Sequence, residues 1–161
     1  MATKQQAMML VNAAIRPALQ RLNLWSSSAQ ELLLGTAIVE SDLIHRRQFG
    51  PGPARGLFQM EPRTHNDIWA NFLKYKPALA HAVGSLLSSQ NSDKLVDLER
   101  NDRYASAMAR VHYLRVSEPI PAAGNLKAMA RYWKRHYNTP RGKGTEDKYR
   151  DKWQSVMGSQ Q

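Results

Sequence analysis

The stretch Ala37–Met60, AIVESDLIHRRQFGPGPARGLFQM, sets a single glutamate, Glu40, at the end of an apolar helix. A loop follows in which the prolines and glycines of Gly50–Pro53 cannot continue the helix. The chain then becomes apolar again in Gly56–Met60, GLFQM, which holds one polar side chain among apolar ones. We predict that the rest of the chain folds to support this stretch.

The helix that ends at Glu40 is expected to open with a capping box of Ser28 and Glu31. At 3.6 residues per turn, Leu33, Ala37 and Glu40 project within an arc of about 60°. Partial burial beside this apolar face would raise the pKa of the Glu40 carboxyl and keep it protonated near neutral pH. A general acid for glycoside cleavage needs such a group. The alternative is a helix-terminal glutamate that simply faces water.

Two elements of the stretch are found together in a known family. Glu40-Ser41 supplies an ES pair, and Gly52–Gln59, GPARGLFQ, supplies a following G-x-x-GL(M/F)Q element. In these residues the chain resembles the lysozyme-like lytic transglycosylase family of the SLT type, and the resemblance covers roughly residues 30–140.

Two later segments agree with this resemblance. Tyr113-Leu114 ends a predicted helix as the family's YL pair does, and Tyr137-Asn138 stands where the family has AYNAG. After Asn138 the chain reads Thr139–Gly142, TPRG, instead of Ala-Gly, so this match is partial. Tyr132 competes with Tyr137 for the family's tyrosine in a shifted alignment.

The resemblance implies a peptidoglycan lytic transglycosylase that cleaves the MurNAc-GlcNAc β-1,4 bond without a cofactor. Glu40 would act first as acid and then as base, giving 1,6-anhydro-muramyl ends, and Tyr137 would hydrogen-bond its carboxylate. The implied substrate-binding residues are Ser41, Gln59, Tyr113, Tyr137 and Asn138, of which Ser41 and Gln59 hold either the substrate or the glutamate in place. A hydrolytic muramidase on the same fold is the alternative, and Asp42 would then be reconsidered as its base.

The length of 161 residues suits one domain with a sizeable core. We predict a mainly helical, lysozyme-like α+β domain over residues 1–161, with a very small β element at Leu57–Met60 beside the active-site groove. Pro17 should bend or divide the first helix. The predicted helices span residues 4–22, 28–40, 62–73, 77–87, a short helix through 95–98 capped by Asn91 or Ser92, 102–116, a helix from 126 to 137 capped by Asn125, and 145–157 capped by Thr145.

The composition and the absence of certain motifs limit which metal sites, other activities and partners we expect. The chain has no cysteine, and its five histidines show no HExxH or paired spacing, so we predict no metal site. No GxSxG, GxxxxGK[ST] or GxGxxG motif is present. The net charge of +10 predicts an anionic partner, which could be cell wall, nucleic acid or a membrane surface. A non-enzymatic, nucleic-acid-binding helical protein therefore stays an alternative, as does an inactive structural component of a virus particle.

The segment Met1–Gln6 is too polar to lead a signal peptide, and the longest apolar run, Leu32–Val39, is too short to span a bilayer. If the substrate is peptidoglycan, another agent must deliver the protein to it. We therefore expect a bacteriophage protein that is virion-associated or delivered to the bacterial periplasm. Its expected partners are peptidoglycan glycan strands and other virion or tail proteins.

Overall fold

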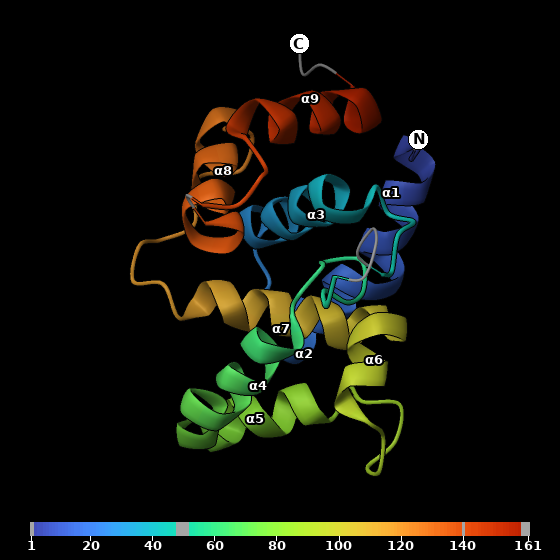
Figure 1. The fold of residues 1–161 in the computed structure, drawn as a ribbon, viewed down its shortest axis with the longest axis vertical. Coiled ribbons are helices and arrows are strands. Elements are labelled where there is room, and N and C mark those ends of the chain that lie inside the picture. Colours follow the sequence, from blue (N-terminus) through green and yellow to red (C-terminus); the bar gives the residue numbers. More distant parts are fainter. Residues whose placement is uncertain (1, 48–51, 140, 159–161) are drawn as a thin grey trace.

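The computed structural model describes residues 2–47, 52–139 and 141–158, and it is mainly helical, as predicted (Figure 1). Two of the helical segments are single π-helical turns (η1, η3) and one is a 3-10 turn (η2). The helical segments are α1 (Lys4–Leu10), η1 (Val11–Ile15), α2 (Arg16–Arg21), α3 (Ser27–Ser41), α4 (Pro62–Asn71), η2 (Leu73–Tyr75), α5 (Pro77–Gly84), α6 (Lys94–Arg100), α7 (Asp102–Leu114), α8 (Leu126–Trp133), η3 (Lys134–Asn138) and α9 (Glu146–Met157).

Helix α3 is the centre of the molecule. It contacts α1, α2, α7, α8 and α9, and Figure 1 shows it between α9 above and α7 below. Consecutive residues from Leu32 to Val39 are buried, so the helix is covered on every side. A helix that is apolar all round belongs in a core, and the stretch that ends at Glu40 therefore lies where other helices can reach it.

The start of α3 corrects one prediction. Ser26, not Ser28, is the cap, and its hydroxyl accepts the backbone N–H of Ala29 at 3.0 Å. Glu31 does not close a capping box, because its carboxylate accepts the backbone N–H of Gly124 at 3.0 and 3.1 Å. The run of three serines offers several candidate caps, and this contact with the distant loop after α7 decides what Glu31 does.

The N-terminal helix is continuous through α1, η1 and α2, with the wider turn η1 directly before Pro17. Pro17 has no N–H to donate to the carbonyl of Ala13, its partner in an α-helix. Arg103 of α7 donates its Nε to this Ala13 carbonyl at 2.8 Å instead. The predicted bend is therefore accommodated by one π turn and one side chain from α7.

The local signals for the later helices are largely confirmed. Pro62 and Pro77 begin α4 and α5, and Asn125 and Thr145 cap α8 and α9. The helix predicted for residues 102–116 is α7, which ends slightly earlier, at Leu114. For α6 the prediction of the cap was wrong. Asp93 takes that place instead of Asn91 or Ser92, because its carboxylate accepts the N–H of Leu95 at 2.9 Å.

The predicted β element is smaller than a strand. Within the described residues, the only β pairing near the GLFQ segment consists of two isolated antiparallel bridges, Arg47 with Arg55 and Arg55 with Met60. Residues 56–59 form a turn between Arg55 and Met60, whose backbones exchange hydrogen bonds of 2.9 and 3.1 Å. Gly50 and Pro51 of the predicted loop lie outside the described residues.

Candidate active site

Glu40 lies in the last turn of α3, partly buried. The helix stops just after it because Asp42 and Leu43 take left-handed backbone conformations, with φ of 53° and 61°. Lys152 of α9 binds the Asp42 carboxylate at 3.0 Å and so ties this helix end to α9. Asp42, the alternative base considered from the sequence, is therefore engaged in an ion pair.

The carboxylate of Glu40 accepts a hydrogen bond from a side chain of α8. Trp133 of α8 donates its indole Nε1–H to Glu40 Oε2 at 3.1 Å. The Trp133 ring is itself buried against Tyr149 of α9, with ring centroids 5.5 Å apart, so the donor is fixed in place. The Trp133 ring is therefore part of the core, but its N–H faces the candidate acid.

Burial raises the pKa of Glu40 from its ordinary value of 4.5 to about 7, because the surrounding protein disfavours the charged form. The hydrogen bond from Trp133 and the positive charges of Lys148 and Lys152 act in the opposite direction and limit the rise. The acid is thus poised near neutral pH, where it can both give and take a proton.

Tyr137 lies close to Glu40, since the negative charge of the glutamate contributes, after burial, to raising the pKa of Tyr137 well above its usual range. The expected hydrogen bond from Tyr137 to the carboxylate is not the one in the structure. Its hydroxyl donates to the backbone carbonyl of Phe58 at 2.6 Å. The observed donor to Glu40 is Trp133, so the sequence assigned this contact to the wrong aromatic residue.

The competing tyrosine, Tyr132, points elsewhere, with its hydroxyl donating to the carbonyl of Glu118 at 2.8 Å. Tyr113 lies between the two tyrosines, stacked on Tyr137 with ring centroids 5.2 Å apart and tilted on Tyr132 at 5.6 Å. The geometry therefore favours Tyr137 over Tyr132 as the tyrosine beside Glu40. Tyr113 is buried, and its hydroxyl pairs with Thr36 of α3 at 2.8 Å.

The GLFQ segment forms a tight turn whose glycine has a physical cause. Gly56 has φ of +75°, and a Cβ there would stand 2.2 Å from the carbonyl oxygen of Leu98. Gln59 closes the turn, donating its Nε2 to the carbonyls of Gly56 at 2.9 Å and His45 at 3.2 Å. Phe58 is buried, and its carbonyl receives the Tyr137 hydroxyl, so the turn is joined to η3.

Ser41 and Asn138 make contacts within the protein. Ser41 is buried, and its hydroxyl donates to the carbonyl of Ala37 at 2.9 Å and accepts the N–H of Leu43 at 3.2 Å. Asn138 accepts the ammonium of Lys134 at 2.8 Å. These contacts support the end of α3 and the loop after η3, and Gln59 likewise holds its own turn together.

Sequence reasoning did not find three residues that act on Glu40, namely Trp133 as a donor, Lys148 and Lys152. The two lysines stand four apart, one turn of α9, so they share a face, but nothing in the sequence says that α9 packs on α3. Only the tertiary arrangement brings these residues to the glutamate.

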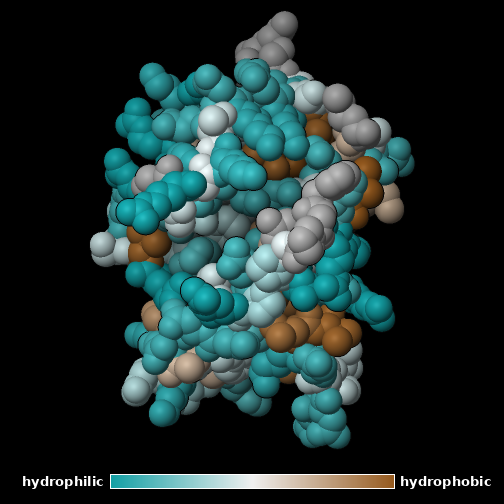
Figure 2. All heavy atoms as spheres, viewed as in Figure 1, coloured by the Kyte–Doolittle hydropathy of each residue, from teal (hydrophilic) through white to brown (hydrophobic). Residues whose placement is uncertain are grey.

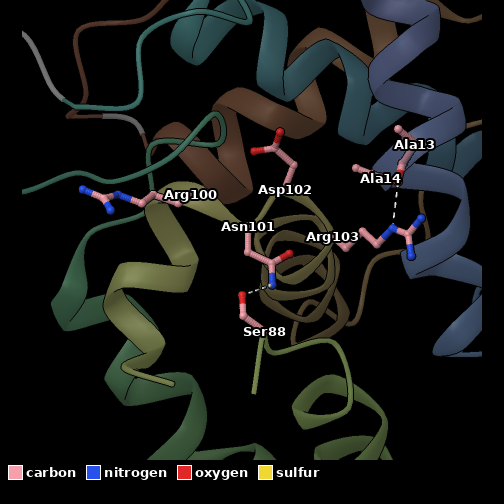
Figure 3. Close-up of a pocket in the computed structure, with 7 residues that line it drawn as sticks. All are labelled: Ala13, Ala14, Ser88, Arg100, Asn101, Asp102 and Arg103. Atoms are coloured by element: carbon pink, nitrogen blue, oxygen red, sulfur yellow. Dashed lines mark hydrogen bonds between the residues drawn. The ribbon is translucent and has the colours of Figure 1, made fainter. Parts of the chain in front are cut away.

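The face shown in Figure 2 is mostly hydrophilic and is hollowed between the part over α8 and α9 and the part over α4 and α7. Two clefts lie elsewhere in the described part of the chain. One of about 450 Å³ lies where η1 meets the start of α7, and Figure 3 shows Arg103 reaching across it to Ala13. The other, of about 700 Å³, lies between α4 and the start of α6.

Within the described ranges, no three His, Asp or Glu side chains converge in a way that could hold a metal ion. Nor does any helix in those ranges combine the length and apolar character that a bilayer span requires.

Taken together, the fold and the site define a mainly helical protein with a half-buried carboxylic acid at the end of its central helix. Comparison with protein-family models, with curated proteins and with solved structures gives no match for this chain.

Proposed function

We propose that the protein is a peptidoglycan lytic transglycosylase in which Glu40 is the acid and the base. The observation that carries the proposal is the state of Glu40, a glutamate whose pKa is raised to about 7 by burial and whose carboxylate accepts the N–H of Trp133 at 3.1 Å. A glycosidase acid must hold its proton at neutral pH, and the ordinary pKa of a glutamate does not allow this.

In the proposed reaction, protonated Glu40 gives its proton to the glycosidic oxygen as the bond from that oxygen to C1 of the muramyl sugar breaks. The freed N-acetylglucosamine leaves with a new hydroxyl. The Glu40 carboxylate then takes the proton of the muramyl C6 hydroxyl as the oxygen of that hydroxyl bonds to C1. A 1,6-anhydro ring results, and Glu40 is protonated again.

The partners of Glu40 suit both halves of this cycle. Burial favours the protonated acid before cleavage, whereas the Trp133 N–H and the charges of Lys148 and Lys152 stabilise the carboxylate that forms next. A pKa near the working pH keeps the two states close in free energy. Neither half of the reaction is then strongly uphill.

The charged groups that act on Glu40 are lysines rather than a second carboxylate, and this supports transglycosylation over hydrolysis. Most glycoside hydrolases use a pair of carboxyl groups, one of which serves as nucleophile or activates a water. Asp42, the nearest acid in sequence, is paired with Lys152. In the proposed reaction the substrate's own C6 hydroxyl, assisted by its N-acetyl group, replaces that second residue.

The proposal includes a lysozyme-like arrangement of the helices, with the glycan strand lying in the hollow of Figure 2. That hollow lies between α8 and α7, and α8 with η3 carries Trp133 and Tyr137. The net charge of +10 suits an anionic wall. We further propose that the protein reaches peptidoglycan as a virion-associated protein of a bacteriophage, together with virion or tail proteins.

The test is digestion of purified peptidoglycan by the wild type and by Glu40→Gln, with the products analysed by mass spectrometry in water enriched in oxygen-18. Glu61→Gln is the matched control, since Glu61 is an exposed glutamate just after the GLFQ turn. The expected result is anhydro-muramyl products without the heavy isotope from the wild type and from the control, and none from Glu40→Gln.

Heavy oxygen at new reducing ends would instead identify a muramidase. No release of fragments by the wild type, together with salt-dependent DNA binding that is unaltered in Glu40→Gln, would replace the enzymatic proposal by nucleic-acid binding.

A further inference from the structure

A second feature of the molecule has the chemistry of a ligand site. The cleft of about 700 Å³ between α4 and the start of α6 is lined by nine residues, none of which is a candidate site residue around Glu40. Its volume is in the range of sites that hold small organic ligands. Trp69 of α4 contributes a half-buried indole to this cleft.

The indole is held rigidly by a hydrogen-bonded chain. The Trp69 Nε1–H donates to the Tyr104 hydroxyl at 2.9 Å, and this hydroxyl also pairs with His65 Nε2 at 2.7 Å. His65 Nδ1 lies 2.9 Å from the side-chain oxygen of Asn66, which can only accept, so Nδ1 carries the proton. The Tyr104 proton then goes to Nε2 of a neutral His65, whose pKa burial lowers. The Trp69, Tyr104 and His65 donors of this chain are thus all used.

Around this ring the cleft carries exposed charged groups and short polar groups. The Lys94 ammonium lies over the Trp69 ring, 5.1 Å from its centroid, and Lys74, also exposed, lines the same cleft. Asn66, Ser92 and Asp93 contribute an amide, a hydroxyl and a carboxylate. An apolar plane bordered by such groups matches a pyranose ring, which has an apolar face and a rim of hydroxyls. The two ammonium groups can pair with a carboxylate carried by such a sugar.

We propose that this cleft binds a carboxylate-bearing saccharide, whose sugar ring takes the place of the Lys94 ammonium over Trp69 while its carboxylate pairs with Lys94 and Lys74. The proposal rests on the proposed function, since peptidoglycan is a polymer of such units. The cleft would then be a second contact with the polymer, away from Glu40, which keeps the protein on the wall between cleavage events. The two contacts together would increase the affinity for the polymer over that of either site.

The experiment uses the full chain labelled with 5-fluorotryptophan, so that each indole gives a fluorine NMR signal and Trp69→Phe assigns the signal of Trp69. The probe is N-acetylmuramyl dipeptide, and tetra-N-acetylchitotetraose, which has no carboxylate, is the comparison. The expected result is a saturable shift of the Trp69 signal with the muramyl probe and a much weaker response to the uncharged tetramer. Added salt should weaken the muramyl response.

Binding measured by calorimetry identifies the contributing side chains. Trp69→Leu should raise the dissociation constant for N-acetylmuramyl dipeptide about tenfold, which is equivalent to about 1.4 kcal/mol. Lys94→Gln should raise it about threefold. Lys127→Gln, an exposed lysine outside the cleft, is the matched control and should leave the dissociation constant unchanged. The Lys94 side chain is exposed, so its replacement tests the site without disturbing the core.

The inference is overturned if the Trp69 signal stays fixed, or if all variants bind equally, while the wild type still releases anhydro-muramyl products. That result leaves the proposed function standing. If the Trp69 signal moves with the muramyl probe but the protein cuts no peptidoglycan, the proposed saccharide site stands and the proposed function fails. A signal that responds only to an oligothymidine strand would reassign the cleft to nucleic acid and refute the saccharide.

Discussion

Replacing Glu40 by glutamine should change how the stability of the protein depends on pH. In the folded chain the pKa of Glu40 is raised from 4.5 to about 7, so between these values the folded state holds a proton that the unfolded state has released. The stability of the wild type therefore falls as pH rises through this window. The span from 4.5 to about 7 corresponds to about 3 kcal/mol.

Glutamine imitates the protonated acid at every pH and can still accept the Trp133 N–H. The free energy of unfolding of Glu40→Gln, relative to that of the wild type, should therefore be about 3 kcal/mol larger at pH 8 than at pH 4, so the variant gains relative stability as pH rises. For a chain of 161 residues this amounts to roughly 6 to 12 °C in Tm. Other titrating groups are common to both proteins and cancel in the difference.

The assay is thermal unfolding followed by circular dichroism at intervals from pH 4 to pH 8 for the wild type, Glu40→Gln and Glu61→Gln. The exposed Glu61 tests the same chemical change without the burial. A difference in Tm between Glu40→Gln and the wild type that stays constant over the whole range would show that Glu40 is solvated in solution. The mechanism built on its burial would then be wrong.

Three further results are expected. The activity on peptidoglycan should fall above a pH of about 7, because Glu40 loses its proton there. Lys148→Gln should move this fall in activity to higher pH, because it removes a positive charge that favours the carboxylate, and an unchanged pH profile of the rate would contradict this electrostatic explanation. Tyr149→Phe should leave stability unchanged or up to about 1 kcal/mol higher in denaturant titrations, because its buried hydroxyl has no hydrogen-bond partner among the described residues. Tyr104→Phe should instead cost about 3 kcal/mol, because it leaves the ring nitrogens of the buried His65 and the half-buried Trp69 unpaired, and equal effects of the two substitutions would refute this comparison. Gly56→Ala should lower the free energy of unfolding by about 2 kcal/mol or more and reduce activity, because residue 56 has a positive φ and the added Cβ would meet a carbonyl oxygen. Thermal unfolding and the release of products measure the two effects, and a Tm equal to that of the wild type would refute the prediction.

The helices could be predicted from the sequence because their signals are local. A proline at the first position or an asparagine cap such as Asn125 acts within one turn, and apolar spacing marks the buried face of α7. The cap of α3 was misplaced because three serines compete within one turn and the contact of Glu31 with Gly124 cannot be read from either segment. The π turn η1 could not be predicted from periodicity either, since it depends on Pro17 and on the contact of Arg103 with Ala13.

In the candidate site, too, the residues with local signals could be predicted, whereas those that depend on tertiary packing could not. Glu40 and Gly56 could be singled out because each stands in a short pattern with a physical reason. Trp133 could not, since its helical spacing predicts a core residue and its ring is one. That its single polar atom meets Glu40 follows only from how α8 packs on α3, and the lysines of α9 depend on packing in the same way.

The π turn before Pro17 also fixes a phase relation along the N-terminal helix. Such a turn holds one residue more than an α-helical turn, and each residue of an α-helix advances the chain by about 100° around the axis. Winding the same residues as a regular α-helix would rotate α1 by about that angle relative to α2. Ala7 and Leu10, now buried, would then swing toward solvent, so the irregular winding is what aligns the two halves on one core.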